Sequence, residues 1–97
     1  MSKLCFEWDN SKNRINQQKH GISFEEAETV FCDGYARLTG DPDHSDGEER
    51  FVLLGTSRKS RVLIVCHCYR ENDDVIRIIS ARKAAPKERK QYKEFLI

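Results

Sequence analysis

Several side chains in this 97-residue sequence could bind a phosphate group or transfer a proton. Arg82 follows a mostly apolar run over residues 75–81, and its planar guanidinium can donate two parallel hydrogen bonds to phosphate oxygens. His20 can exchange a proton near neutral pH. Glu88 could accept one, and on a helix it would share a face with Tyr92, one turn later. These residue types suit acid–base chemistry at a phosphate.

Each of these residues also has a structural interpretation. Arg82 could be a solvated arginine at the end of a strand. Lys19 and His20 precede a glycine, and the helix dipole favours basic side chains in the last turn of a helix. Glu88 could complement the N-terminal dipole of the last helix. Tyr92 could be an aromatic at the edge of the core, so residue type alone does not decide between the two sets of roles.

Arg70 and Arg77 flank a predicted turn between two strands, so a hairpin would bring them close together. Two neighbouring positive charges are unfavourable unless an anion lies between them. One interpretation is a bound anion such as a phosphate. The other is that Glu71, Asp73 and Asp74, in the same turn, neutralise both arginines.

The cysteines do not follow the spacing of a secreted disulfide framework, and we expect free thiols at Cys5, Cys32, Cys66 and Cys68. The run of Cys66, His67 and Cys68 invites a comparison with zinc sites. On a strand, however, the two cysteines share one face and the histidine points to the other. The sequence offers no second ligand pair at zinc spacing. We therefore expect no metal site and no cofactor.

Positioning these residues requires a mixture of strands and helices. Ser23 and Glu26 form a capping-box pattern before an apolar helical stripe, and Gly21 is typical of a helix C-terminus. An acidic loop spans residues 40–49. We expect strands over residues 5–8, 35–39, 50–55, 61–69 and 75–81, with helices over 11–20, from 23 to 33–34, and from Pro86 onward. The predicted fold class is α+β, a single antiparallel sheet with helices packed on one face, in the order β-α-α-β-β-β-β-α.

The length predicts one domain over residues 1–97. Residues 1–49 carry five basic and eleven acidic groups, a net charge of −6, whereas residues 50–97 carry twelve basic and five acidic groups, a net charge of +7. A basic half can attract a polyanion and an acidic patch can attract a basic partner, although both could be ordinary solvated surfaces. No signal peptide or membrane-spanning run is recognisable, so we expect a soluble cytoplasmic protein that does not contact membranes.

Three blocks of residues resemble those of a known family. The sequence is similar to the BrnT family of toxins over nearly its whole length, about residues 5–95. The combination of Lys-His-Gly near the start with Ile-Ser-Ala-Arg near the end carries most of the specificity. The blocks are Phe6 to Asp9 with Lys12, Asn16, Lys19 to Gly21 and Phe24 to Ala27; Glu48 to Phe51 with Gly55; and Arg77 to Ala84 with Glu88 and Tyr92.

The resemblance implies a RelE-like ribonuclease fold and a toxin that cleaves RNA without a metal, which would inhibit translation and growth. It also implies a BrnA-like antitoxin with a ribbon-helix-helix part. Operator DNA would then be bound only through the toxin–antitoxin complex. The alternatives are a non-catalytic RNA-binding module and a protein-interaction module.

Cleaving RNA without a metal requires a base for the 2′-hydroxyl, cations beside the phosphate and an acid for the leaving 5′-oxygen. Within the resemblance we expect Arg82 to hold the scissile phosphate and Glu88 to act as base. The expected catalytic residues are Arg82, Glu88, His20 and Lys19, and the expected RNA-binding residues are Arg70, Arg77, Lys83, Lys12 and Tyr92.

Overall fold

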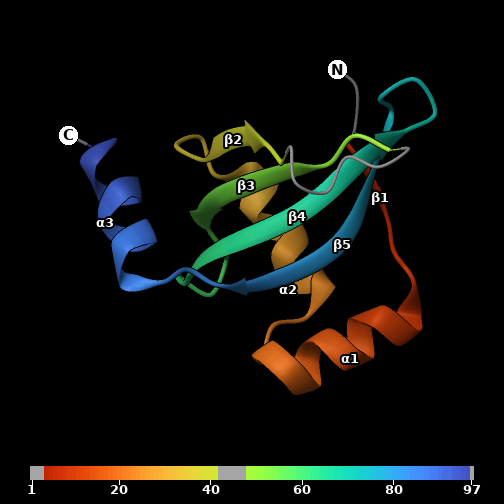
Figure 1. The fold of residues 1–97 in the computed structure, drawn as a ribbon, viewed down its shortest axis with the longest axis horizontal. Helices are drawn as coiled ribbons and strands as arrows, with labels where there is room; N and C mark the ends of the chain where they lie inside the picture. The colour runs from red at the N-terminus through yellow and green to blue at the C-terminus, as the bar shows by residue number, and fades with distance from the viewer. Residues whose placement is uncertain (1–3, 42–47, 97) are drawn as a thin grey trace.

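The computed structural model describes residues 4–41 and 48–96, and its centre is a five-stranded sheet (Figure 1). The strand order in the sheet is β1-β5-β4-β3-β2. The strands are β1 (Cys5–Glu7), β2 (Arg37–Gly40), β3 (Phe51–Thr56), β4 (Val62–Arg70) and β5 (Val75–Lys83). The helices are α1 (Asn10–His20), α2 (Phe24–Thr29), the short 3₁₀ helix η1 (Val30–Cys32) and α3 (Pro86–Glu94). The α+β class is confirmed, and most of the predicted acidic loop lies outside the described residues.

The expectation of a wholly antiparallel sheet is wrong for one strand. β2, β3, β4 and β5 form an antiparallel meander, as their short connections predict. β1 instead lies parallel to β5, with Cys5 opposite Val75 and Glu7 opposite Arg77. No hairpin fixes the direction of β1, because nearly the whole chain separates it from its partner. The sheet is therefore mixed.

The main core lies between one face of the sheet and α2 with η1, which Figure 1 shows behind the strands. The apolar stripe predicted for the second helix is confirmed, since Phe24, Ala27 and Val30 are fully buried. The helix is shorter than expected and continues as η1. The buried cluster consists of Ile22, Phe24, Ala27, Val30, Leu53, Leu63, Val65, Ile78 and Ala81.

The helix α3 departs from the predicted packing on one face, because it stands at the end of the sheet, away from α1 and α2 (Figure 1). Tyr92 anchors it there. The Tyr92 hydroxyl donates to Asp33 Oδ2 at 2.5 Å and accepts from Thr56 Oγ1 at 3.0 Å. Asp33 also accepts the backbone N–H of Thr56 at 2.8 Å. One carboxylate thus joins the segment after η1, the end of β3 and the last helix.

The helix α1 is attached through buried amides rather than apolar side chains. Its large apolar residue Ile15 is 59% exposed, whereas Asn13 and Asn16 are buried. Asn16 Nδ2 donates to the carbonyls of Ala81 and Ile22, each at 2.8 Å, and its Oδ1 accepts the Ala81 N–H at 3.1 Å. Because β1 pairs only with the first residues of β5, the Asn16 amide takes the place of a neighbouring strand at Ala81.

A β-bulge in β5 decides which of its side chains face away from the core. Cys66 lies opposite Ser80 and His67 lies opposite Ile78, so Ile79 is an additional residue in β5. Before the bulge, Ile76 and Ile78 face the core; after it, Ala81 does. Without the extra residue, the alternation of Ile76 and Ile78 would continue through Ser80 and Arg82. The bulge therefore turns Arg82 to the face opposite α2.

We predict that Asn16→Asp destabilises the fold by at least about 2 kcal/mol at pH 7. The substitution keeps the shape of the side chain but replaces both amide donors with a buried carboxylate oxygen that faces the Ala81 and Ile22 carbonyls. Denaturant unfolding of wild type and variant would measure the difference. Gln18→Glu, an equivalent change on the exposed side of α1, should cost less than about 0.5 kcal/mol. Equal stability of Asn16→Asp and wild type would contradict the assigned role.

A second prediction concerns the pH dependence of the Tyr92 anchor. Burial disfavours the charged form of Asp33, but hydrogen bonds from Thr56, Tyr92 and Tyr35 outweigh it and lower its pKa from the ordinary 3.8. The pKa of Asp33 is lower in the folded protein than in the unfolded chain. The stabilisation from its hydrogen bonds is therefore present above pH 3.8 and is lost as the pH falls through the pKa of the folded state. Tyr92→Phe should cost about 1–3 kcal/mol at pH 7.

Thermal unfolding of Tyr92→Phe should differ from wild type less and less as Asp33 becomes protonated. The control is Tyr35→Phe, because the Tyr35 side chain is 62% exposed and only its backbone N–H reaches Asp33. A constant difference between Tyr92→Phe and wild type from pH 7 to pH 2.5 would show that the Asp33 charge is not involved.

Candidate functional site

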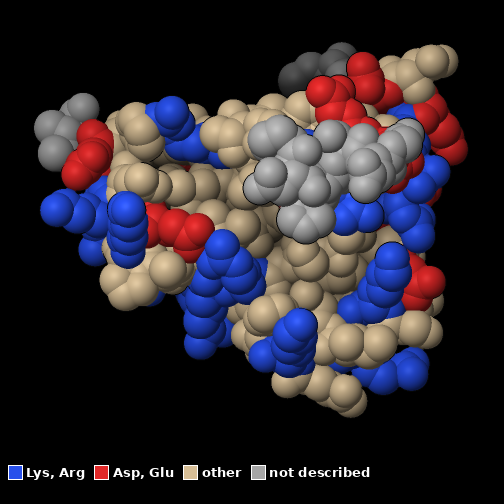
Figure 2. Space-filling view, viewed as in Figure 1, with Lys and Arg blue, Asp and Glu red and all other residues tan. Residues whose placement is uncertain are grey.

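A hollow of about 330 Å³ lies on the face of the sheet opposite α2. Figure 2 shows it as a tan depression near the centre of the view, with Lys and Arg side chains around it. Four elements contribute: the end of α1, the start of β3, the first half of β4 and the second half of β5; Asp41 after β2 and Arg50 before β3 complete the lining. The hollow is lined by His20, Asp41, Arg50, Val52, Ile64, Cys66, Ile79, Ser80, Ala81 and Arg82.

The floor of the hollow is a row of small and apolar side chains across three strands. Val52 lies opposite Cys66, and Cys66 lies opposite Ser80. Burial raises the pKa of the Cys66 thiol, Asp41 raises it further, and Arg50 and Ser80 only partly offset both. The thiol is therefore protonated at neutral pH, which makes Cys66 a weak nucleophile. The reactive groups of the hollow are at its rim.

Arg82 occupies one side of this rim and is held in place by Glu88. Its Nη1 and Nη2 donate to the two carboxylate oxygens of Glu88 at 2.8 and 2.9 Å. Nη1 also donates to the Lys83 carbonyl at 3.2 Å. The side chain is nevertheless 44% exposed. A guanidinium has five N–H groups, so Nε and the second N–H of Nη2, which point the same way, still have no acceptor among the described residues.

The surroundings of Glu88 make it a weak base. The Arg82 guanidinium lowers the pKa of the Glu88 carboxyl, and so does the Ala85 N–H, which donates to it at 2.7 Å; burial only partly opposes them. A carboxylate whose charged form is so favoured accepts a proton poorly. The same contacts cap the start of α3. The geometry of Glu88 therefore favours orienting Arg82 over accepting a proton.

His20 lines the same hollow as Arg82 and comes from a different element. It is the last residue of α1, and the helix ends where Gly21 adopts the left-handed conformation, with φ of 71°. Asn16, one turn earlier, is the residue bonded to Ala81, so these hydrogen bonds also set the position of His20. Lys19 beside it is exposed and does not line the hollow.

The four basic residues predicted to bind RNA lie outside the hollow. Lys83 is exposed at the end of β5, and Lys12 is exposed in the first turn of α1. Arg70 and Arg77 do lie close together, and Glu7 of β1 bridges them, 2.7 Å from Arg77 Nη1 and 3.6 Å from Arg70 Nε. Neither alternative from the sequence foresaw a carboxylate from the first strand. An external phosphate would have to compete with Glu7 there.

Two residues have a position that differs from the one expected from the sequence, Tyr92 and Arg50. Tyr92 is only 4% exposed, so its ring offers no surface for stacking on a base and behaves as an aromatic at the core edge. Arg50, by contrast, lines the hollow and was not singled out as a site residue. The signal for Arg50 was its place in the Glu48 to Phe51 block. Its position in the same hollow as Arg82 depends on strand register, which the sequence does not show.

Comparisons with known proteins agree with this architecture. The family model described as the ribonuclease toxin BrnT of type II toxin–antitoxin systems matches residues 8–88. The crystal structure of the Brucella abortus ribonuclease toxin BrnT has a TM-score of 0.62 and 21% sequence identity, and the match covers 86% of this chain and 99% of that one. A search of curated proteins gave no match. Since the family match spans most of the sequence, the chain belongs to the BrnT family of ribonuclease toxins of type II toxin–antitoxin systems.

Proposed function

We propose that this chain is an endoribonuclease that cuts RNA in the hollow between α1 and β5 without a metal ion, and so inhibits translation and growth. The observation that carries the proposal is the arrangement of Arg82, whose guanidinium is fixed by Glu88 while its second edge faces outward. That edge presents two parallel N–H groups, the geometry that matches two phosphate oxygens.

The charge that a metal would otherwise offset can be offset by arginines. Arg50, directly before β3, and Arg82 of β5 line the same hollow. Fixed cations in a partly desolvated site stabilise the charge that develops on a phosphate during cleavage. His20, on the same rim, is the proposed proton-transfer group, and Lys19 is proposed to support it from the surface. We assign Glu88 the role of holding Arg82 rather than that of the base.

The RNA strand on either side of the cut would follow basic side chains near the hollow. Lys83 continues the strand that carries Arg82, and Lys12 lies at the other end of α1. Arg70 and Arg77 would extend this surface only where a phosphate displaces Glu7. Such contacts to the backbone position an RNA without reading its sequence. Tyr92 has no place in this surface, because it is buried.

We further propose that a BrnA-like antitoxin with a ribbon-helix-helix part neutralises the toxin, and that operator DNA is bound through the complex. The RelE-like character of the fold and the cytoplasmic location belong to the same proposal. None of the helices in residues 4–41 and 48–96 is long and apolar enough to span a membrane.

The first test of this function is chelation. Purified toxin, separated from its antitoxin, should cleave RNA at an unchanged rate in excess EDTA, because Arg82 and Arg50 offset the phosphate charge. Gel analysis of a labelled RNA would measure the rate. Loss of cleavage in EDTA, restored by a divalent cation, would show that the mechanism needs a metal. Binding without cleavage in either condition would favour the non-catalytic RNA-binding alternative.

The second test concerns Arg82. Arg82→Ala should lower the cleavage rate roughly 100- to 1,000-fold, equivalent to about 3–4 kcal/mol of transition-state stabilisation. Arg82→Lys should recover only part of the activity, because an ammonium keeps the charge and loses the fork. Cleavage assays and growth arrest on expression would measure both effects. Thermal midpoints near that of wild type would show that the variants are folded.

The variant Glu88→Gln distinguishes a residue that positions Arg82 from a residue that acts as the catalytic base. A holding residue should change the rate modestly and leave the pH dependence of cleavage unaltered, since the amide oxygen of the variant can still accept a hydrogen bond from Arg82. A base should abolish cleavage and remove the acidic limb of the pH profile. Lys90→Ala, an exposed change on the same helix, is the matched control. Full activity of folded Arg82→Ala would remove Arg82 from the mechanism.

A further inference from the structure

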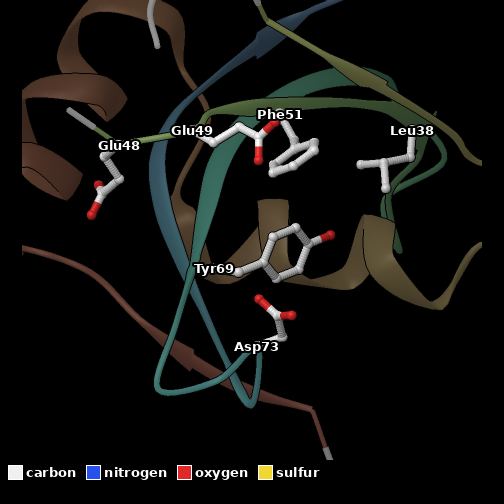
Figure 3. A pocket seen from close by; sticks show the side chains of 6 residues that line it. All are labelled: Leu38, Glu48, Glu49, Phe51, Tyr69 and Asp73. Atoms are coloured by element: carbon white, nitrogen blue, oxygen red, sulfur yellow. The ribbon is translucent and has the colours of Figure 1, made fainter. Parts of the chain in front are cut away.

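A second cavity, of about 460 Å³, lies on the opposite face of the sheet from the hollow. Leu38 of β2, Phe51 of β3 and Tyr69 of β4 alternate with the residues that line the hollow, so they face the side that carries α2. Figure 3 shows the rings of Phe51 and Tyr69 turned toward each other, with Leu38 beside them. Three carboxylates complete the lining: Glu48, Glu49 and Asp73.

The aromatic walls of this cavity are fixed from behind by a buried histidine. His67 is fully buried, and burial lowers its pKa, so its ring is neutral at physiological pH. Its Nε2 lies 3.3 Å from the Tyr69 hydroxyl. The ring centroids of Phe51 and Tyr69 are 5.2 Å apart with an edge-to-face geometry. The two rings therefore form a preformed apolar wall at which a cation can be stabilised by the π-electrons.

Only one of the three carboxylates is paired with a basic side chain of the described residues. Glu48 is paired with Arg70, with Oε2 3.1 Å from Nη2. Glu49 and Asp73 have no ion pair or hydrogen bond among the described residues, and both are exposed. In Figure 3 the Glu49 carboxylate lies beside Phe51 and the Asp73 carboxylate lies next to the Tyr69 ring. An aromatic wall with two carboxylates that no basic side chain in residues 4–41 and 48–96 neutralises is complementary to a guanidinium or an ammonium group.

The cavity adjoins the outer edge of the sheet. β2 is an edge strand, and all of its residues are exposed. Leu38, in the middle of this strand, is 51% exposed and lines the cavity. The backbone groups on the outer side of an edge strand can pair with an added strand. Alternate side chains of such a strand would lie on the face where the cavity opens.

We propose that this cavity binds an arginine or lysine side chain of the antitoxin, carried by an extended segment that pairs with β2. The proposal rests on the family's antitoxin partner and adds the surface that the antitoxin uses. RNA is the less suitable occupant, because Glu49 and Asp73 repel phosphates. The cavity and the hollow are lined by different residues on opposite faces of the sheet, so antitoxin binding and RNA cleavage can be altered separately by mutation.

The test compares two double variants for their affinity to purified antitoxin by calorimetry. Glu49→Lys with Asp73→Lys should weaken the Kd at least about tenfold, because it replaces attraction with repulsion inside the cavity. The control is Glu71→Lys with Asp74→Lys, which lies in the same turn as Asp73, makes the same change in net charge and does not line the cavity. The control should bind within about twofold of wild type.

Both double variants should cleave RNA at the wild-type rate. This result keeps the proposal separate from the ribonuclease function. If wild type does not cut RNA, that function is overturned, but the comparison of affinities remains valid. If the reversed pair does not fold, Glu49→Gln with Asp73→Asn decides, with a smaller loss of affinity. Equal affinity of cavity variant and control overturns the proposal. So does a change in RNA affinity or in the oligomeric state of the free toxin that the control does not share, since the occupant would then be RNA or a second copy.

Discussion

The arrangement of the site depends on one buried amide. Asn16 satisfies both backbone groups of Ala81 and the carbonyl of Ile22, and so attaches a polar helix to a strand edge through buried hydrogen bonds. Arg82 directly follows Ala81, and His20 lies one helical turn after Asn16; these two residues are proposed to act on RNA. Because the amide bonds to backbone atoms, these hydrogen bonds do not require particular side chains at positions 22 and 81. A hydrogen bond of this kind is costly to leave unmade in a buried setting.

The other constraints act on Arg82 alone. The bulge at Ile79 turns it out of the core, and Glu88 takes up two of its N–H groups while it caps α3. Fixing the side chain in advance reduces the entropy that would be lost when it binds a phosphate. Tyr92 and Asp33 hold α3 against β3, so the position of Glu88 depends in turn on the buried end of that helix.

Local signals predicted most of the elements, and long-range pairing explains the differences. Turn residues and alternating side chains predicted the meander of β2 to β5, and the glycine at the end of α1 is left-handed as its type favours. Three features depend on strand pairing: the direction of β1, the bulge at Ile79 and the Glu7 bridge between two arginines. β1 pairs with a strand about 70 residues away, and the local sequence pattern carries no information about that pairing. Arg82 was recognised from its type and motif, whereas Arg50 required the strand register.

The pairing of the first strand with the last has a consequence for synthesis on the ribosome. Cys5 and Val75 are neighbours in the sheet, and Asn16 is hydrogen-bonded to Ala81 across 65 positions, so both contacts join residues far apart along the chain. Contacts so distant along the chain form only after the intervening polypeptide has left the exit tunnel, and they tend to slow folding. The hollow therefore cannot be complete before β5 has left the tunnel. Until then the nascent chain lacks the arrangement proposed to cut RNA.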